Sequence, residues 1–170
     1  LPIASRPHGG GDPMNGSRWP LVLLVVVLIA AHFVFRIGFG LGERFPDLLV
    51  VALLLAAREM RPGGAAGLGL LLGFLEGSVI PFSLGASALV LTVLGYLGAR
   101  SRDVLSGDGV VLTALYLFAG KWLYDALLAL VLWTVAEPTS ASALLLIAPL
   151  AALYAALAGV AALSAYRSVA

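Results

Sequence analysis

Residues 20–39 read PLVLLVVVLIAAHFVFRIGF, a run of 20 residues in which only His32 and Arg36 are ionisable. A helix of about 20 apolar residues is long enough to cross the hydrocarbon core of a bilayer. The whole chain shares this character, because 61% of its 170 residues are hydrophobic, only 11% are charged and its mean hydropathy is +1.05. Soluble domains carry about 45–50% apolar and about 25% charged residues. The composition therefore excludes an ordinary soluble domain and predicts an all-α integral membrane protein.

Further apolar runs, separated by helix breakers, extend this reading to a bundle of six transmembrane helices. The expected helices span residues 20–39, 46–60, 64–80, 84–100, 110–135 and 143–166. Pro20 and Pro46 suit a first helical turn, and Pro62 with the two glycines after it breaks the chain between the second and third helices. The second helix would rise only about 22 Å. It must therefore pack inside the bundle, thin the bilayer, or reach the interface through Arg58.

Residues 1–18 are rich in Gly, Pro and Ser and predict a disordered lead-in, so we expect residues 19–170 to form a single transmembrane domain.

The positions of the basic residues predict the orientation of this domain in the membrane. Seven arginines fall on the side of the two chain ends: Arg6, Arg18, Arg58, Arg61, Arg100, Arg102 and Arg167. Only Arg36 and Arg44 fall on the opposite side. By the positive-inside rule, both termini face the cytoplasm.

Composition also excludes several function classes. The net charge of +1 gives no field for nucleic acid, and the absence of cysteine excludes thiol chemistry and thiolate metal sites. Two distant histidines, His8 and His32, do not predict a metal site, and no cofactor is expected. No nucleophile lies with a base and an orienting group, so we do not expect an enzyme. Because the connections are short, we expect the protein to act through helix surfaces within the lipid bilayer, through an internal cavity, or through short loops that bind a partner.

Small residues recur at helical spacing in two of the expected helices. The first row is Gly69, Gly73 and Gly77, and the second includes Ala152, Ala155 and Gly159. In lipid, such rows let helices approach closely, because association there depends on van der Waals contact. Each row predicts either internal packing of the bundle or the docking of another protein's helix.

Three ionisable residues lie inside expected spans, where charges are costly and often functional. Lys121 and Asp125 are one helical turn apart, and Glu76 lies in the third helix. Counted from the cytoplasmic ends of their helices, Glu76 and Lys121 both lie about 16 Å deep. We therefore expect a buried Glu76–Lys121–Asp125 cluster, which is either a structural cluster or a proton or substrate site.

Other polar residues near the outer ends have simpler interpretations. His32 and Arg36 are expected to extend toward the membrane interface. Asp47 is expected in the first turn of the second helix, where the helix dipole favours a carboxylate.

Part of the chain resembles a known family. Pro46-Asp47-Leu48-Leu49 is followed by Gly73-Phe74-Leu75-Glu76-Gly77 and then by Ser83-Leu84-Gly85-Ala86-Ser87-Ala88-Leu89. This pattern over residues 46–100 resembles the core of the MreD rod-shape-determining family, with Pro46, Asp47, Gly73, Leu84 and Gly85 at its motif positions. The family's usual aspartate would fall at Gly77, whereas this chain carries Glu76 one position earlier.

The resemblance implies a non-enzymatic scaffold of the elongation (Rod) complex in the bacterial cytoplasmic membrane. Its implied partners are MreC, the RodA synthase and a class B penicillin-binding protein, with MreB and RodZ as further members of the complex. The implied role is support of peptidoglycan synthesis and rod cell shape.

Two alternatives remain open. The chain is also similar in layout to the substrate-binding membrane subunits of energy-coupling-factor transporters, which would need a polar cavity open to the outside. An intramembrane enzyme would need paired catalytic groups, for which only Glu76 and His32 are available.

Overall fold

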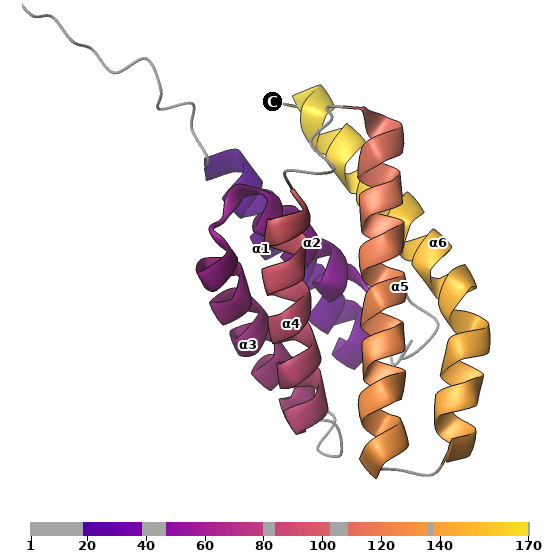
Figure 1. Cartoon of the computed structure of the whole chain (residues 1–170). Helices are drawn as coiled ribbons and strands as arrows, with labels where there is room; N and C mark the ends of the chain where they lie inside the picture. Colours follow the sequence, from indigo (N-terminus) through magenta and orange to yellow (C-terminus); the bar gives the residue numbers. More distant parts are fainter. Residues whose placement is uncertain (1–18, 39–46, 80–83, 103–108, 136–137, 170) are drawn as a thin grey trace, which may run out of the picture.

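A computed structural model of the chain describes residues 19–38, 47–79, 84–102, 109–135 and 138–169. The regular structure in these ranges is helical, as predicted, and forms six α-helices (Figure 1). The helices are α1 (Trp19–Phe33), which continues as the π-helical segment η1 (Val34–Gly38), α2 (Leu48–Glu59), α3 (Pro62–Val79), α4 (Leu84–Ser101), α5 (Val110–Val135) and α6 (Pro138–Val169). The expected lead-in at residues 1–18 and the motif residue Pro46 lie outside the described residues.

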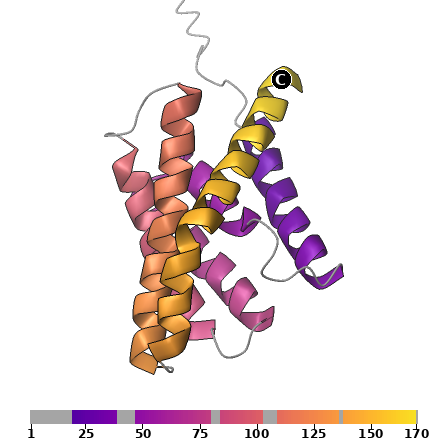
Figure 2. The same cartoon turned by 90° about the vertical axis from the view of Figure 1, so that its right-hand side faces the viewer.

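The helices form two pairs around a central helix. α3 packs along α4, and α5 packs along α6 (Figures 1 and 2). α2 lies between the pairs and contacts α3, α4, α5 and α6, while α1 packs on α2 from the side. α1 begins and α6 ends at the same end of the bundle (Figure 1). α2 and α4 end, and α3 begins, at this same end (Figure 1). These helix ends carry Arg58, Arg61, Arg100 and Arg102, so we call it the arginine-rich end.

α2 is buried along almost its whole length. Each residue from Leu48 to Ala57 is at most 8% exposed. Its sequence, LLVVALLLAARE, is apolar on every face until its last turn, and a helix of that kind is stable only in an interior. The 12 residues rise only about 18 Å. The structure thus selects the first of the three expected solutions for this short helix, which is packing inside the bundle.

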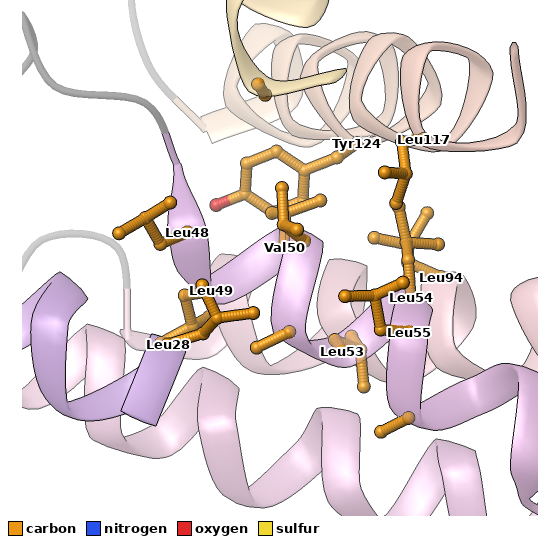
Figure 3. Close-up of a cluster of buried hydrophobic side chains, with 14 of the residues drawn as sticks. Leu28, Leu48, Leu49, Val50, Leu53, Leu54, Leu55, Leu94, Leu117 and Tyr124 are labelled. Atoms are coloured by element: carbon orange, nitrogen blue, oxygen red, sulfur yellow. The ribbon is translucent and has the colours of Figure 1, made fainter. Parts of the chain in front are cut away.

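Leucine side chains from α2 fill the space between the surrounding helices. Leu49 lies near Leu28 of α1, and Leu54 lies near Leu94 of α4 (Figure 3). Leu117 and Tyr124 of α5 close the same cluster from the other side (Figure 3). In lipid these contacts stabilise the bundle mainly by dispersion and close packing.

The glycine row of α3 is an internal packing face. A methyl group at Gly69 would overlap the backbone carbonyl of Leu91, and one at Gly73 would overlap the backbone of Ala88. On α4, a methyl group at Gly95 would likewise overlap the carbonyl of Ala65. Gly77 is buried on the same helix. The backbones of α3 and α4 therefore touch, which is possible only where side chains are absent.

The small residues of α6 are also turned inward. Ala152 and Ala155 are fully buried. A methyl group at Gly159 would lie 2.6 Å from Cδ1 of Leu117 and 2.9 Å from Cγ1 of Val51. This face of α6 packs on α5 and α2, so of the two expected uses of the rows, the described helices show internal packing.

The outer surface of the bundle is apolar. Large side chains such as Val111, Leu150 and Leu157 are 79%, 73% and 61% exposed. Three helical stretches are long and apolar enough to cross a membrane: Trp19–Gly38, Val110–Thr134 and Ala148–Ala165. An apolar surface of this extent is unfavourable in water and suits lipid. The described structure is therefore compatible with a helical membrane protein.

Candidate functional site

Lys121, in the middle of α5, pairs with two carboxylates. Its Nζ donates a hydrogen bond of 2.5 Å to Oδ1 of Asp125 and one of 3.3 Å to Oδ2 of Asp47. Helical spacing places Asp125 one turn after Lys121 on the same face. Asp47 comes from a different element, because it is the N-cap of α2 and also accepts a hydrogen bond of 3.4 Å from the backbone N–H of Val50. Lys121 therefore joins α5 to the start of α2.

Glu76, in the last turns of α3, pairs with two basic groups from the first helix. Arg36 donates to Oε1 of Glu76, and Nε2 of His32 lies 3.2 Å from Oε2. Arg36 belongs to η1, a π-helical segment, and such segments are frequent at functional sites. His32 belongs to the last turn of α1. Glu76 therefore ties α3 to the end of α1.

His32 links these two groups of charges. Its Nδ1 lies 3.8 Å from Oδ1 of Asp47, while its Nε2 faces Glu76. The result is one connected chain, which we call the charge network: Arg36, Glu76, His32, Asp47, Lys121 and Asp125. When His32 is neutral, two cations face three carboxylates, whereas a protonated His32 balances the network at zero. A protonated ring can also donate to both neighbouring carboxylates at once.

The network is buried at its centre and reaches the surface at two members. The side chains of His32, Glu76, Lys121 and Asp125 are 6–8% exposed, whereas those of Arg36 and Asp47 are 22% and 21% exposed. A charge placed in an apolar interior is very costly unless it is paired. The pairs in the network supply that compensation.

Two details complete the surroundings of Lys121. Its Nζ lies 4.7 Å from the centre of the Tyr124 ring, a cation–π geometry. Oδ2 of Asp125 is buried and has no hydrogen-bond partner within the part of the chain that the structure describes.

The structure brings Glu76, Lys121 and Asp125 into one network but does not pair Glu76 with Lys121 as the sequence predicts. Among the described contacts, Glu76 binds His32 and Arg36, and Lys121 binds Asp47 and Asp125. The physical reason is lateral position, because α3 packs on α4 and α2 and does not pack extensively on α5. Equal depth in a membrane does not make two helices neighbours.

His32, Arg36 and Asp47 belong to the site, although sequence reasoning placed them at the interface. His32 and Arg36 turn inward to Glu76 instead of extending toward solvent. A feature of the sequence could have indicated this pairing. A carboxylate such as Glu76 inside an apolar helix needs a cation, and His32 and Arg36 are two basic residues one turn apart in another apolar helix. Asp47 has the expected place at the start of α2 and additionally accepts from Lys121.

A second set of polar contacts closes the arginine-rich end. The hydroxyl of Tyr116 lies 3.0 Å from the carbonyl oxygen of Leu54 and 3.2 Å from that of Gly98, so it bridges α2 and α4 from α5. Arg58 donates a hydrogen bond of 3.1 Å to Thr113, and its guanidinium lies 5.7 Å from the centre of the Tyr116 ring. Arg102 donates to the carbonyl of Arg58. These contacts hold the ends of α2, α4 and α5 together.

The motif positions differ in what they do. Asp47 takes part in the charge network, and Gly73 lies at the contact with α4. Leu84 is the first residue of α4, and a Cβ atom at Gly85 would meet no described atom within 4 Å. Two of the motif positions therefore have a clear physical role in the bundle.

A hollow of about 470 Å³ lies between α4 and α5, with Leu54 of α2 among its lining residues. It is lined mainly by leucine, glycine and alanine residues, and its polar residues are Arg100, Ser101 and Tyr116. The six residues of the charge network do not line it. We call this hollow the α4–α5 groove.

The network is an arrangement for joining helices, because each of its carboxylates lies against a basic group. Within the described residues, no group of three or more His, Asp or Glu side chains has the geometry to hold a metal ion. Comparison of the chain with protein-family models, curated proteins and solved structures finds no match.

Proposed function

We propose that the chain is a non-enzymatic membrane scaffold that binds a single-span partner through its helices. The observation that carries this proposal is the charge network, in which ionisable groups inside the bundle compensate one another. Such an interior stabilises the fold, so the apolar outer surface is the part of the molecule left to make contacts. The resemblance of residues 46–100 to the MreD family supports the same role.

In this proposal the chain crosses the bacterial cytoplasmic membrane six times, with both termini in the cytoplasm. The arginine-rich end would face the cytoplasm, as the positive-inside rule requires. The common end at which α1 begins and α6 ends supports an even number of crossings (Figure 1). The short α2 would complete its crossing inside the bundle, where lipid does not surround it.

The proposed partners follow from the resemblance. MreC is the direct partner, and RodA with a class B penicillin-binding protein is reached directly or through MreC. MreB and RodZ are further members of the complex. The role of the chain would be to support peptidoglycan synthesis and rod cell shape.

A substrate-binding subunit of an energy-coupling-factor-type transporter is the second candidate. It is favoured by one observation, the partial exposure of Arg36 and Asp47, through which the network reaches the surface. The apolar lining of the α4–α5 groove opposes it, because a polar substrate needs polar groups in its pocket.

The test is affinity purification of a tagged copy from its native membranes in mild detergent, followed by mass spectrometry of the proteins and small molecules that are retained. The scaffold proposal expects MreC, with or without the synthase. Recovery of ATPase subunits, or of a small molecule without any cell-wall protein, would contradict it and favour transport. An unrelated tagged membrane protein of similar size serves as the control for non-specific recovery.

A further inference from the structure

The α4–α5 groove exists because α2 separates the two helix pairs. α3 packs on α4 and α5 packs on α6 far more extensively than α4 packs on α5. Leu54 of α2 lies against Gly120 of α5, where an added Cβ atom would overlap it, and against Gly98 of α4, where an added Cβ atom would lie 3.2 Å from its Cδ2. The groove is therefore bounded on its inner side by the buried part of α2 and is open toward the surface of the bundle.

The walls of the groove match a hydrocarbon chain. Leu94 and Leu97 lie on the α4 side, and Ala119 and Leu123 lie on the α5 side. Leu97 is 39% exposed, so the groove can be reached from the surface. A polar solute or ordered water would find few hydrogen-bonding groups along these walls.

The size of the groove argues for a lipid chain over a protein helix. A helix with side chains is about 10 Å across, so its cross-section is roughly 80 Å². The groove of about 470 Å³ would hold only about one turn of such a helix. A flexible acyl chain is much thinner and can lie along the whole groove.

A positive charge lies at one end of the groove. Arg100 lines it, is exposed, and has no ion pair in the part of the chain that the structure describes. The neighbouring Arg58 is occupied by Thr113 and Tyr116. A guanidinium group binds phosphate oxygens well, and basic pockets between transmembrane helices bind anionic lipid headgroups.

We propose that the α4–α5 groove is a binding site for an anionic phospholipid. One acyl chain lies along the apolar walls, and the phosphate of the headgroup pairs with Arg100 at the arginine-rich end. This site is separate from the charge network and does not depend on the proposed scaffold function.

The test is native mass spectrometry of the purified full chain in detergent, titrated with phosphatidylglycerol or with phosphatidylcholine of the same acyl chains. We expect phosphatidylglycerol to be retained in preference. The Arg100→Gln variant should lower phosphatidylglycerol occupancy about fivefold, the factor expected for one basic residue at a membrane surface. Arg61→Gln is the matched control, because Arg61 is exposed near the same end but does not line the groove.

A second variant tests the groove itself. Ala119→Trp should fill it and lower the retention of both lipids, and Leu97→Trp serves the same purpose from the opposite wall if the first variant does not fold. Size-exclusion profiles and helix content by circular dichroism report folding. Equal retention of the two lipids, unchanged by Arg100→Gln and by either Trp variant, would mean ordinary surface lipid and would overturn the proposal. Loss of a co-purifying protein in the Trp variants with unchanged lipid retention would also overturn it.

Discussion

At the scale of single residues, the ion pairs of Glu76 show how a charge is compensated inside an apolar bundle. It receives Arg36 and His32 from the first helix, and its side chain is only 8% exposed. Removing one member of a buried pair leaves the other charged and uncompensated, which costs more than removing both. We therefore expect a large coupling energy between two residues of the charge network only where their side chains are in direct contact.

A double-mutant cycle tests this at single residues. We expect Arg36→Gln and Glu76→Gln to show a coupling energy of about 1 kcal/mol or more in unfolding, since the two side chains touch. The cycle of Glu76→Gln with Lys121→Met should give a coupling energy at least twofold smaller, because the described structure shows no direct contact between them. Reversible unfolding in detergent, followed by circular dichroism, measures both. A larger coupling for Glu76 with Lys121 than with Arg36 would refute the observed pairing.

Three of the six residues of the charge network, and one of its pairs, could be predicted from the sequence. Lys121 and Asp125 were predictable as a pair because helical spacing alone places them together. The partners of Glu76 were not, because depth along a helix says nothing about which helices are neighbours. His32 and Arg36 were misjudged because a long basic side chain near a helix end can reach either the interface or the interior.

At the scale of the helices, α3 and α4 can pack closely because glycines leave their contact faces without side chains. α3 and α4 meet backbone to backbone at Gly69 and Gly73.

Helix boundaries could be predicted well where breakers flank an apolar run, as for α5, whose bounds agree with the prediction. They could not where polar residues extend a helix, as in α6, which begins at Pro138 and passes through Pro149. A proline suits the first turn of a helix, and neighbouring helices can tolerate one inside it.

Substitution of the glycines in α3 tests the packing face. Gly73→Ala should destabilise the bundle by about 1–3 kcal/mol, because its methyl group has no room against α4. Gly67→Ala on the same helix is the control, since a methyl group there meets nothing within 4 Å. We expect it to be neutral or slightly stabilising, as alanine is the better helix former. Thermal unfolding in detergent compares the two, and equal effects would show that α3 does not pack on α4 through Gly73.

The Tyr116 hydroxyl tests how α2, α4 and α5 are joined. Tyr116→Phe removes the donor to the carbonyl groups of Leu54 and Gly98 and should cost about 1 kcal/mol of stability. Tyr96→Phe is the matched control, because Tyr96 is 49% exposed on the surface of α4. The same unfolding measurement applies, and a loss of stability in the Tyr96 variant as large as in the Tyr116 variant would count against this role.

At the scale of the whole molecule, the described part combines a buried charge network with an apolar exterior. Four ionisable side chains of the network, those of His32, Glu76, Lys121 and Asp125, are buried, and large apolar side chains cover the outside of the bundle. The composition predicts this apolar exterior, because no soluble fold can cover so much apolar surface. Composition could not predict that the small-residue rows are used inside the bundle, since the same rows would serve an external partner equally well.

The proposed orientation in the membrane can be tested by labelling single introduced cysteines, because the chain contains no cysteine of its own. Gly38→Cys, at the end of η1, and Gly63→Cys, in the first turn of α3, introduce thiols at opposite ends of the bundle, at positions where a Cβ atom meets no other described atom within 4 Å. In spheroplasts, a membrane-impermeant maleimide should label the Gly38→Cys variant readily and the Gly63→Cys variant only after lysis. The reverse pattern would contradict the proposed orientation.

The central claim is that the buried charges stabilise the bundle by compensating one another. It is tested most directly by comparing the stability and partner recovery of Lys121→Met with those of the triple variant Lys121→Met/Asp47→Asn/Asp125→Asn. We expect the single variant to lose about 3 kcal/mol or more, because the buried carboxylate of Asp125 and the partly buried carboxylate of Asp47 both lose their cation. The triple variant should regain most of that stability, since Asn can still cap α2, and should recover the same partner protein as the unaltered chain. A triple variant that folds as stably as the unaltered chain but no longer retains that partner, or a single variant with no loss of stability, would contradict the claim.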